Sequence, residues 1–317
     1  MEKITFKDNW DEMCPLFIKK ENKYEHVGTG VLLNIWDNTY LLTASHVIDF
    51  IYVNKNELFM PNNQGISIKI DGELFHNPLV WNQKRGDDKI DFSYFKLNKK
   101  MISQIIDIFK PLNDKQISFE KNFCTNLDSK TFNLSQKKRT STVRNEIKEY
   151  SKVLETTDES QIREYTDARI QQIITFAGYP LTKTKNHAGF VRSELVYYHG
   201  RAMLEKNYLD ESLNKDINIL AEFGKKGVYK EGVGFLNSPN PFGISGGGIY
   251  KTIRTDDGFD RKLIGIGHTY LAKKHLFIGT NLAYCLDVIK NERLMPYEVF
   301  NRLTNMSRMA FEYLKNK

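Results

Sequence analysis

Pro241-Phe242-Gly243-Ile244-Ser245-Gly246-Gly247-Gly248 is the stretch that decides how this 317-residue chain is interpreted. It places one serine among glycines, and the Ile249-Tyr250 that follows is typical of a strand. Glycine lets the backbone turn sharply and lets a substrate carbonyl come close to main-chain amides. Ser245 is therefore a candidate nucleophile, and the amides of Gly243 and Ser245 are candidate donors to a developing oxyanion.

Two upstream segments supply the other groups that such a serine needs. The segment 41–46 ends a predicted strand with His46, and a histidine held at the end of a buried strand can act as a general base. Taken alone, His46 could equally be a core histidine bonded to the backbone. Asp91 begins an apolar run, whereas Asp87 and Asp88 lie in the preceding turn. Asp91 is therefore the better partner for His46.

Short strand patterns separated by turn signals run through most of the chain. They cover residues 15–35, 40–43, 66–70, 90–97, 173–177, 190–198, 217–223, 248–253, 263–267 and 276–279. Helical spacing is found at 101–109, within the polar segment 113–170 and after residue 282. We expect an all-β fold with added helices.

The order His46, Asp91, Ser245 resembles that of the trypsin-like serine peptidases. Thr43-Ala44-Ser45-His46 is similar to their TAxH segment, and Gly243-Ile244-Ser245-Gly246-Gly247 is similar to their GxSGG. Residues 91–97 resemble their D-[IL]-A-x-[LI] strand, with Ser93 in place of the usual alanine. The residues at 178–180 and 265–268 resemble strands of the bacterial HtrA-like and glutamyl-endopeptidase-like members.

This resemblance implies a chymotrypsin-like double β-barrel with a partly helical inter-barrel insertion and C-terminal helices. Residues 11–112 would form the N-terminal barrel, which carries the histidine and the aspartate. Residues 113–170 would be the insertion or linker, 171–281 the C-terminal barrel with the serine, and 282–317 the terminal helices.

The resemblance also implies an activity, that of a serine endopeptidase acting on a protein or peptide through an acyl-enzyme, with no cofactor and no metal. Ser245 would attack the peptide carbonyl, His46 would take its proton, and Asp91 would fix the imidazole. An uncontrolled cytoplasmic protease would be toxic, so we expect residues 113–170 to control activity, as the docking site of a protein regulator. Bacterial relatives further imply a role in defence or stress.

Counting back from the serine places the specificity pocket near Pro239 and Asn240. Neither residue is an acid, so the sequence does not predict a preference for Arg or Lys in the substrate. Gly267 and His268 would wall the pocket, where a histidine could bind an acidic side chain. A structural role for His268, bonded to the backbone, is an equal alternative.

The residues next to the glycine-rich stretch decide which other functions it could have. A phosphate-binding loop is excluded because Lys251 comes too late after the last glycine. An α/β-hydrolase esterase also uses GxSxG, and His268 and His275 lie downstream as it requires. A catalytically silent binding protein of the protease fold is a further alternative.

Charge and cysteine content indicate which binding partners and which cellular compartment to expect. The net charge of +7 comes from lysines spread along the chain. The segment 137–152, which begins with the basic residues 137–139, contains only Tyr150 as an aromatic residue, so nucleic acid is not the expected partner. Three widely spaced cysteines without a CxxC pattern predict free thiols in a reducing cytoplasm. No run approaches the roughly 18 apolar residues of a membrane span, and no secretory signal begins the chain.

Overall fold

The structure is a computed structural model that describes most of the regions in which strands are predicted. The described residues are 11–21, 23–53, 57–61, 67–77, 89–121, 123, 173–187, 190–223, 228–230, 234–255, 258–294 and 296–297. The helices predicted within 124–170 and after residue 297 lie outside these residues, as does the proposed regulatory part of the insertion. The division of the chain into four domains stays a prediction.

A seven-stranded antiparallel sheet forms the first half, in the order β5-β4-β1-β2-β3-β7-β6. Its strands are β1 (Met13–Lys20), β2 (Lys23–Ile35), β3 (Asn38–Thr43), β4 (Leu58–Pro61), β5 (Ser67–Lys69), β6 (Gly72–Phe75) and β7 (Ser93–Leu97). Helix α1 (Ser45–Val53) follows β3 directly, and α2 (Lys99–Ile105) follows β7. The residues directly after β3 therefore form a helix, and its second residue is His46.

A six-stranded antiparallel sheet forms the second half, in the order β11-β8-β15-β16-β17-β12. Its strands are β8 (Ile173–Gly178), β11 (Val196–Arg201), β12 (Asn218–Glu222), β15 (Gly248–Thr255), β16 (Gly258–Leu271) and β17 (Leu276–Asn281). Two small hairpins, β9 (Thr184–His187) with β10 (Phe190–Ser193) and β13 (Val228–Lys230) with β14 (Gly234–Leu236), are the other strands of the described residues. The α-helices in the described part of this half are α6 (Glu205–Asp210) and α7 (Leu282–Lys290).

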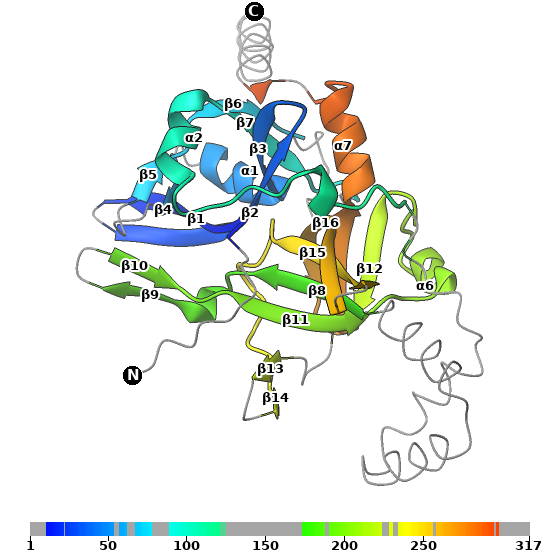
Figure 1. The fold of residues 1–317 in the computed structure, drawn as a ribbon. Helices are drawn as coiled ribbons and strands as arrows, with labels where there is room; N and C mark the ends of the chain where they lie inside the picture. The colour runs from blue at the N-terminus through cyan, green and yellow to red at the C-terminus, as the bar shows by residue number, and fades with distance from the viewer. Residues whose placement is uncertain are drawn as a thin grey trace, which may run out of the picture.

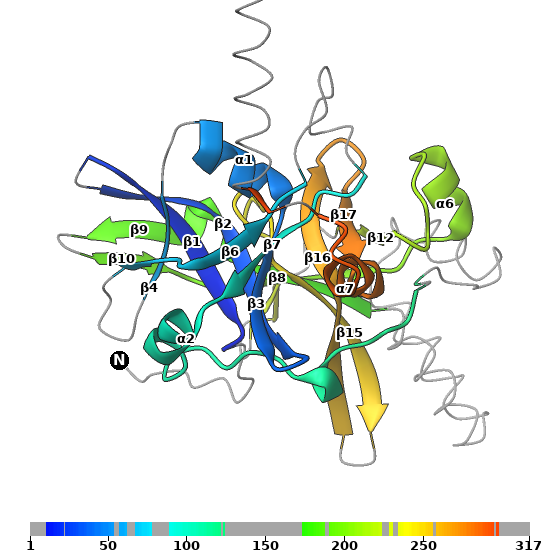
Figure 2. The ribbon, with the colours of Figure 1, turned by 90° about the horizontal axis from the view of Figure 1, so that it is seen from above.

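The two sheets curl separately and lie side by side, the first in blue to cyan and the second in green to orange (Figures 1 and 2). This arrangement confirms the predicted all-β fold of the chymotrypsin-like double-barrel type. The α/β-hydrolase alternative does not fit, because that fold has a helix directly after the serine. Here the residues after the serine loop enter strand β15, which pairs with β8 and β16.

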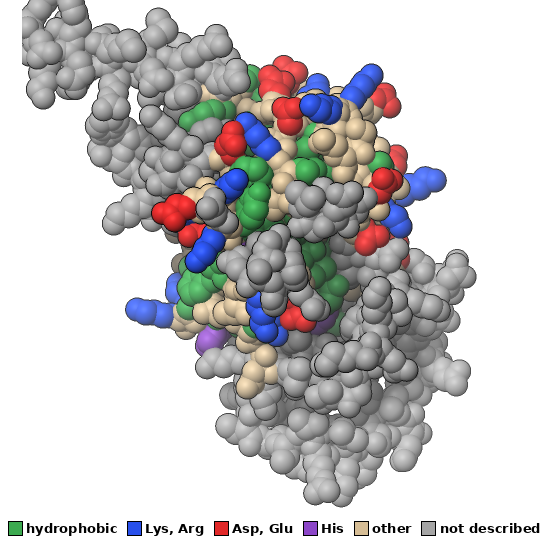
Figure 3. Space-filling model, turned by 90° about the vertical axis from the view of Figure 1, so that its left-hand side faces the viewer, with side chains coloured by type: hydrophobic (Ala, Val, Ile, Leu, Met, Phe, Trp, Pro, Cys, Tyr) green, Lys and Arg blue, Asp and Glu red, His purple; other side chains and the backbone are tan. Residues whose placement is uncertain are grey.

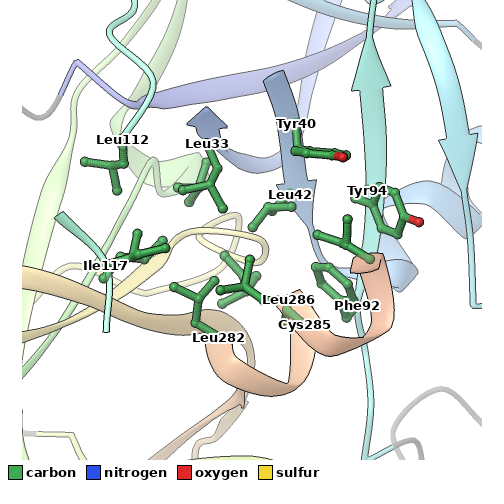
Figure 4. Close-up of a cluster of buried hydrophobic side chains, with 14 of the residues drawn as sticks. Leu33, Tyr40, Leu42, Phe92, Tyr94, Leu112, Ile117, Leu282, Cys285 and Leu286 are labelled. Atoms are coloured by element: carbon green, nitrogen blue, oxygen red, sulfur yellow. The ribbon is translucent and has the colours of Figure 1, made fainter. Parts of the chain in front are cut away.

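The core of the described residues consists of four clusters: one in the first half, two in the second half and one between the sheets. The cluster between the sheets contains Val31, Leu33, Leu42, Phe92 and Tyr94 of the first half and Ala177, Tyr250, Leu263 and Ile266 of the second. Helix α7 completes it with Leu282, Cys285, Leu286, Val288 and Ile289. Figure 4 shows Cys285 and Leu286 facing Leu42 of β3. Burial of these apolar side chains holds the halves together, and α7 contributes to this contact between the two sheets.

Charged side chains of both signs are mixed on the described part of the face in Figure 3. Elsewhere or on this face, the described residues form exposed ion pairs, among them Lys20 with Glu25 and Lys69 with Glu57. Such pairs contribute little to stability, about 0–1 kcal/mol each. Within the described ranges no helix has both the length and the apolar character to cross a bilayer.

Candidate active site

A pocket of about 230 Å³ brings together residues from both halves of the chain. His46 of α1 lines one side of it, and Ser245, in the loop between β14 and β15, lines another. The rest of its wall comes from β8, the serine loop, β15, β16 and β17. The pocket thus contains the predicted base and the predicted nucleophile.

Asp91 makes two hydrogen bonds to His46, one to its ring and one to its backbone. Asp91 Oδ2 lies 2.5 Å from His46 Nδ1, and Asp91 Oδ1 accepts from the backbone N–H of His46 at 2.9 Å. Because an ionised carboxylate only accepts, Nδ1 carries a proton in either state of the ring. Neutral His46 therefore has its lone pair on Nε2, the tautomer that a general base requires.

The environment of Asp91 keeps its carboxylate ionised. Its side chain is only 2% exposed, and such burial alone would raise its pKa. The hydrogen bond and charge of His46, the charge of His268 and the His46 backbone N–H outweigh that effect and lower the pKa to about 2. Since the backbone bond lies in the first turn of α1, the positive end of the helix contributes to the same stabilisation.

The loop that carries Ser245 depends on two glycines with left-handed backbone angles. Gly243 has φ +95° and Gly246 has φ +87°, which other residues rarely adopt. A Cβ on Gly246 would lie 2.1 Å from Thr29 O and 2.2 Å from Thr43 Oγ1. The glycine next to the serine is therefore required by the close approach of the loop to the first sheet.

The backbone amides of this loop divide into two groups. The N–H groups of Ile244, Gly246 and Gly247 donate to Pro241, Gly267 and Ile244 carbonyls at 2.7–3.2 Å. The N–H groups of Gly243 and Ser245, the predicted oxyanion donors, make no hydrogen bond to any described residue. These two amides thus remain available for a ligand.

Ser245 Oγ donates to the carbonyl of His268 at 3.2 Å, and it has no hydrogen bond to His46 within the described residues. His268 is the extra residue of an irregularity between β16 and β17, where Gly267 pairs with Gly279 but Thr269 pairs with Ile278. Such a bulge redirects groups that would otherwise continue the ladder. The bulge thus supplies the carbonyl that holds the serine hydroxyl.

Thr29 of β2 is a site residue that sequence reasoning missed. Its backbone N–H donates to Ser245 O at 2.8 Å, and its hydroxyl donates to Gly243 O at 3.3 Å. The same hydroxyl accepts from the N–H of Tyr179 at 3.0 Å. Thr29 is completely buried and ties the serine loop of the second half to the first sheet. A threonine in a strand carries no sequence signal for this role.

Two of the four residues predicted for the specificity pocket line this pocket. Gly267 and His268 line it, but Pro239 and Asn240 do not; Pro241 and Phe242 occupy that place. The reason is a turn before the serine, in which Asn240 Oδ1 accepts from the N–H of Phe242 at 3.2 Å. The apolar wall, which was not predicted, consists of Phe176, Ile244, Tyr270 and Phe277.

No protein-family model matches this chain, and no curated protein matches it. Among solved structures it is similar to that of neuropsin, a serine protease expressed in the limbic system of mouse brain. The two share 15% sequence identity with a TM-score of 0.45, and the match covers 89% of this chain and 94% of that chain.

Proposed function

We propose that this chain is a serine endopeptidase with Ser245 as nucleophile, His46 as general base and Asp91 as the group that orients His46. The observation that carries the proposal is the pair of hydrogen bonds from His46 to Asp91, which leaves Nε2 as the basic nitrogen of a residue lining the Ser245 pocket. The two amides without partners in the serine loop support it independently. A structural histidine would not need this combination.

The reaction begins when Ser245 Oγ exchanges its bond to the His268 carbonyl for one to His46 Nε2. Oγ then attacks the peptide carbonyl while its proton moves to Nε2, and the negative charge that develops on the carbonyl oxygen is stabilised by the amides of Gly243 and Ser245. The protonated His46 gives its proton to the leaving amine. Water, deprotonated by the same nitrogen, hydrolyses the acyl-enzyme and releases Ser245.

The preferred substrate has a large apolar side chain before the cleaved bond. None of the described residues that line the pocket is an acid, a lysine or an arginine, and three are Phe176, Tyr270 and Phe277. Phe176 and Phe277 stack with ring centroids 4.5 Å apart. His268, the group expected for an acidic substrate, bonds to Thr269 Oγ1 through Nδ1 and lies within electrostatic reach of Asp91.

The cellular setting of the proposed enzyme is a reducing compartment. Cys14 and Cys285 are buried free thiols, and burial raises the pKa of both, which leaves them unreactive. We place the enzyme in the cytoplasm and keep the regulatory role of residues 113–170 and the bacterial defence or stress function as predictions.

The test is labelling of the purified protein with a fluorophosphonate probe. Wild type should react, and Ser245→Ala and His46→Ala should not, with folding checked by circular dichroism. A map of new protein N-termini after expression, with Ser245→Ala as control, then identifies the substrates. Cleavage after Glu or Asp in place of large apolar residues would contradict the proposed pocket chemistry.

A second candidate function is that of a catalytically silent binding protein. It is favoured by one observation, the bond of Ser245 Oγ to the His268 carbonyl in place of His46. Equal failure of wild type and Ser245→Ala to react with the probe, together with unchanged peptide binding, would select this function over hydrolysis.

A further inference from the structure

A second hydrogen-bonded histidine lies directly behind the His46–Asp91 pair. Ser93 Oγ, two residues after Asp91, lies 2.8 Å from Ser45 Oγ and 2.8 Å from His76 Nδ1. His76 Nε2 lies 2.8 Å from Asp49 Oδ1. We call Ser45, Asp49, His76 and Ser93 the α1 network, because it begins and ends on that helix.

The protons of the α1 network can be ordered without conflict. The Asp49 carboxylate only accepts, so His76 Nε2 donates to it and neutral Nδ1 is an acceptor. Ser93 then donates to Nδ1 and accepts from Ser45, so each hydroxyl in the chain has a definite direction. Ser45 and Ser93 are completely buried and His76 is 4% exposed, so water does not compete for the bonds of Ser93, whereas Asp49 at the end of the network is 22% exposed. A satisfied buried polar network rigidifies the elements that it connects.

The network connects the two elements on which the proposed base and its orienting acid depend. Ser45 and Asp49 are four residues apart, so they share one face of α1, and His46 lies between them in sequence. Ser93 begins β7, immediately after the segment that holds Asp91. A further bond connects the residue after His76 to the segment before Ser93: Asn77 Nδ2 donates to the carbonyl of Ile90 at 2.7 Å. The end of β6 thus holds α1 and the segment 90–93 in one arrangement.

A segment from near the C-terminus covers the network from outside. Pro296 forms a β-bridge with Phe75, and the Tyr297 ring meets the His76 ring edge-on with centroids 6.1 Å apart. Burial raises the pKa of Tyr297, and the charge of Asp49 adds to that shift. The network is therefore flanked by β6, β7, α1 and residues 296–297.

We propose that the α1 network is a positioning device that sets the orientation of His46 relative to Asp91 and so determines the rate of the reaction. This rests on the proposed function, because the rate is that of Ser245. Both carboxylate oxygens of Asp91 bond to His46, and those two bonds require α1 and the segment 90–93 to keep one relative position. A misplacement of about 1 Å in a reacting group costs on the order of 10²-fold in rate.

The test uses Ser93→Ala and His76→Phe, which break the network at its centre. The direct readout is the exchange rate with water of the proton on His46 Nδ1, followed by proton NMR of the full chain; we expect it to rise at least tenfold. With a peptide substrate, kcat should fall about 10- to 100-fold at unchanged KM. Asp49→Asn keeps an acceptor for Nε2 and should preserve most of the rate, whereas Asp49→Ala should not.

The matched control is His199→Phe, which removes another imidazole–hydroxyl bond, from His199 Nδ1 to Thr175 Oγ1 at 2.9 Å on the other sheet. It should change neither readout. If Ser93→Ala and His76→Phe fold and keep the wild-type proton exchange rate, the network is only structural and the proposal is wrong. If His76→Phe does not fold, the test uses Ser45→Ala and the comparison of Asp49→Asn with Asp49→Ala. The readouts are again the proton exchange rate of His46 and kcat. If wild type proves inert toward substrates, the proposed function fails, but proton exchange still tests the network.

Discussion

The two halves of the molecule hold their parts of the candidate site by different means. In the first half, side chains hold side chains, as in the bonds of Asp91 to His46 and of Ser93 to His76. In the second half, the backbone holds Ser245 through glycines with positive φ and through carbonyls bonded to Thr29. A base must have one tautomer and one orientation, which side-chain partners provide. A nucleophile must change partners during the reaction, so its loop is fixed while its hydroxyl has a single hydrogen bond, to the His268 carbonyl, that it can exchange.

The largest effect is expected from a change in the first half, Asp91→Asn. The amide keeps the shape of the carboxylate but can donate to His46 Nδ1, which moves the imidazole proton to Nε2 and removes the basic lone pair. Where the analogous change has been made, kcat falls about 10⁴-fold. Steady-state kinetics with a peptide substrate measures this. A loss below about tenfold with the fold retained would mean that Asp91 does not set the tautomer.

The corresponding change in the second half is Gly246→Ala. The added methyl group would overlap Thr29 O and Thr43 Oγ1, and φ +87° strains any residue with a Cβ. Strain of this kind costs about 1–3 kcal/mol before the overlap is counted. Urea unfolding should show a loss of roughly 4 kcal/mol or more. Gly267→Ala is the control, since its nearest contact is 3.2 Å, to the Phe176 ring; equal losses would contradict the account of the loop.

A third prediction concerns His26 of β2, whose ring lies beside the serine loop. A Cβ on Gly243 would lie 3.0 Å from His26 Cε1. Burial lowers the pKa of His26 to about 4, with only partial compensation from the Gly28 backbone. Below its ordinary pKa of about 6.5 the unfolded chain binds a proton that the folded chain does not, so stability is lost as the pH falls from about 6.5 to about 4.

The size of this loss is roughly 3 kcal/mol over that window. Unfolding free energies of wild type and His26→Leu at pH 7 and pH 4.5 measure it. The leucine variant should be much less sensitive to pH, because it has no group to protonate at this position. The same slope in both proteins would assign the pH dependence to other groups.

The smallest effect is expected from Thr29→Val, which removes one hydroxyl at the junction of the halves. The N–H of Tyr179 then loses its acceptor, and an unsatisfied buried group costs about 1–3 kcal/mol. The rate should also fall, because Gly243 loses a donor that fixes its carbonyl. Thr280→Val is the matched control, since that completely buried hydroxyl has no hydrogen-bond partner in the described structure. Equal destabilisation by both changes would remove Thr29 from the site.

The comparison also explains which features could be predicted from sequence. The glycines around Ser245 and the strand pattern before His46 are local, since the chemistry and the backbone need them within a few residues. They were enough to predict the fold, which the structure confirms, and to single out His46, Asp91 and Ser245, whose roles stay a proposal. Thr29 and His76 reach the site only through strand pairing, and nothing near them in the sequence indicates it. Of the four residues predicted for the specificity pocket, Gly267 and His268 line the pocket beside Ser245 and Pro239 and Asn240 do not. Counting back from Ser245 takes no account of the turn at residues 240–242.

Helix α7 has a consequence for the order in which the molecule is made. Domains fold from the N-terminus as they leave the ribosome. His46, Asp91 and Ser245 all precede α7, yet the helix supplies five residues of the core between the sheets. A nascent chain that has not yet released this helix would carry the three residues of the proposed catalytic site without the packing that holds the two halves together. If the proposed function is correct, synthesis itself would delay activity until α7 (Leu282–Lys290) has left the ribosome.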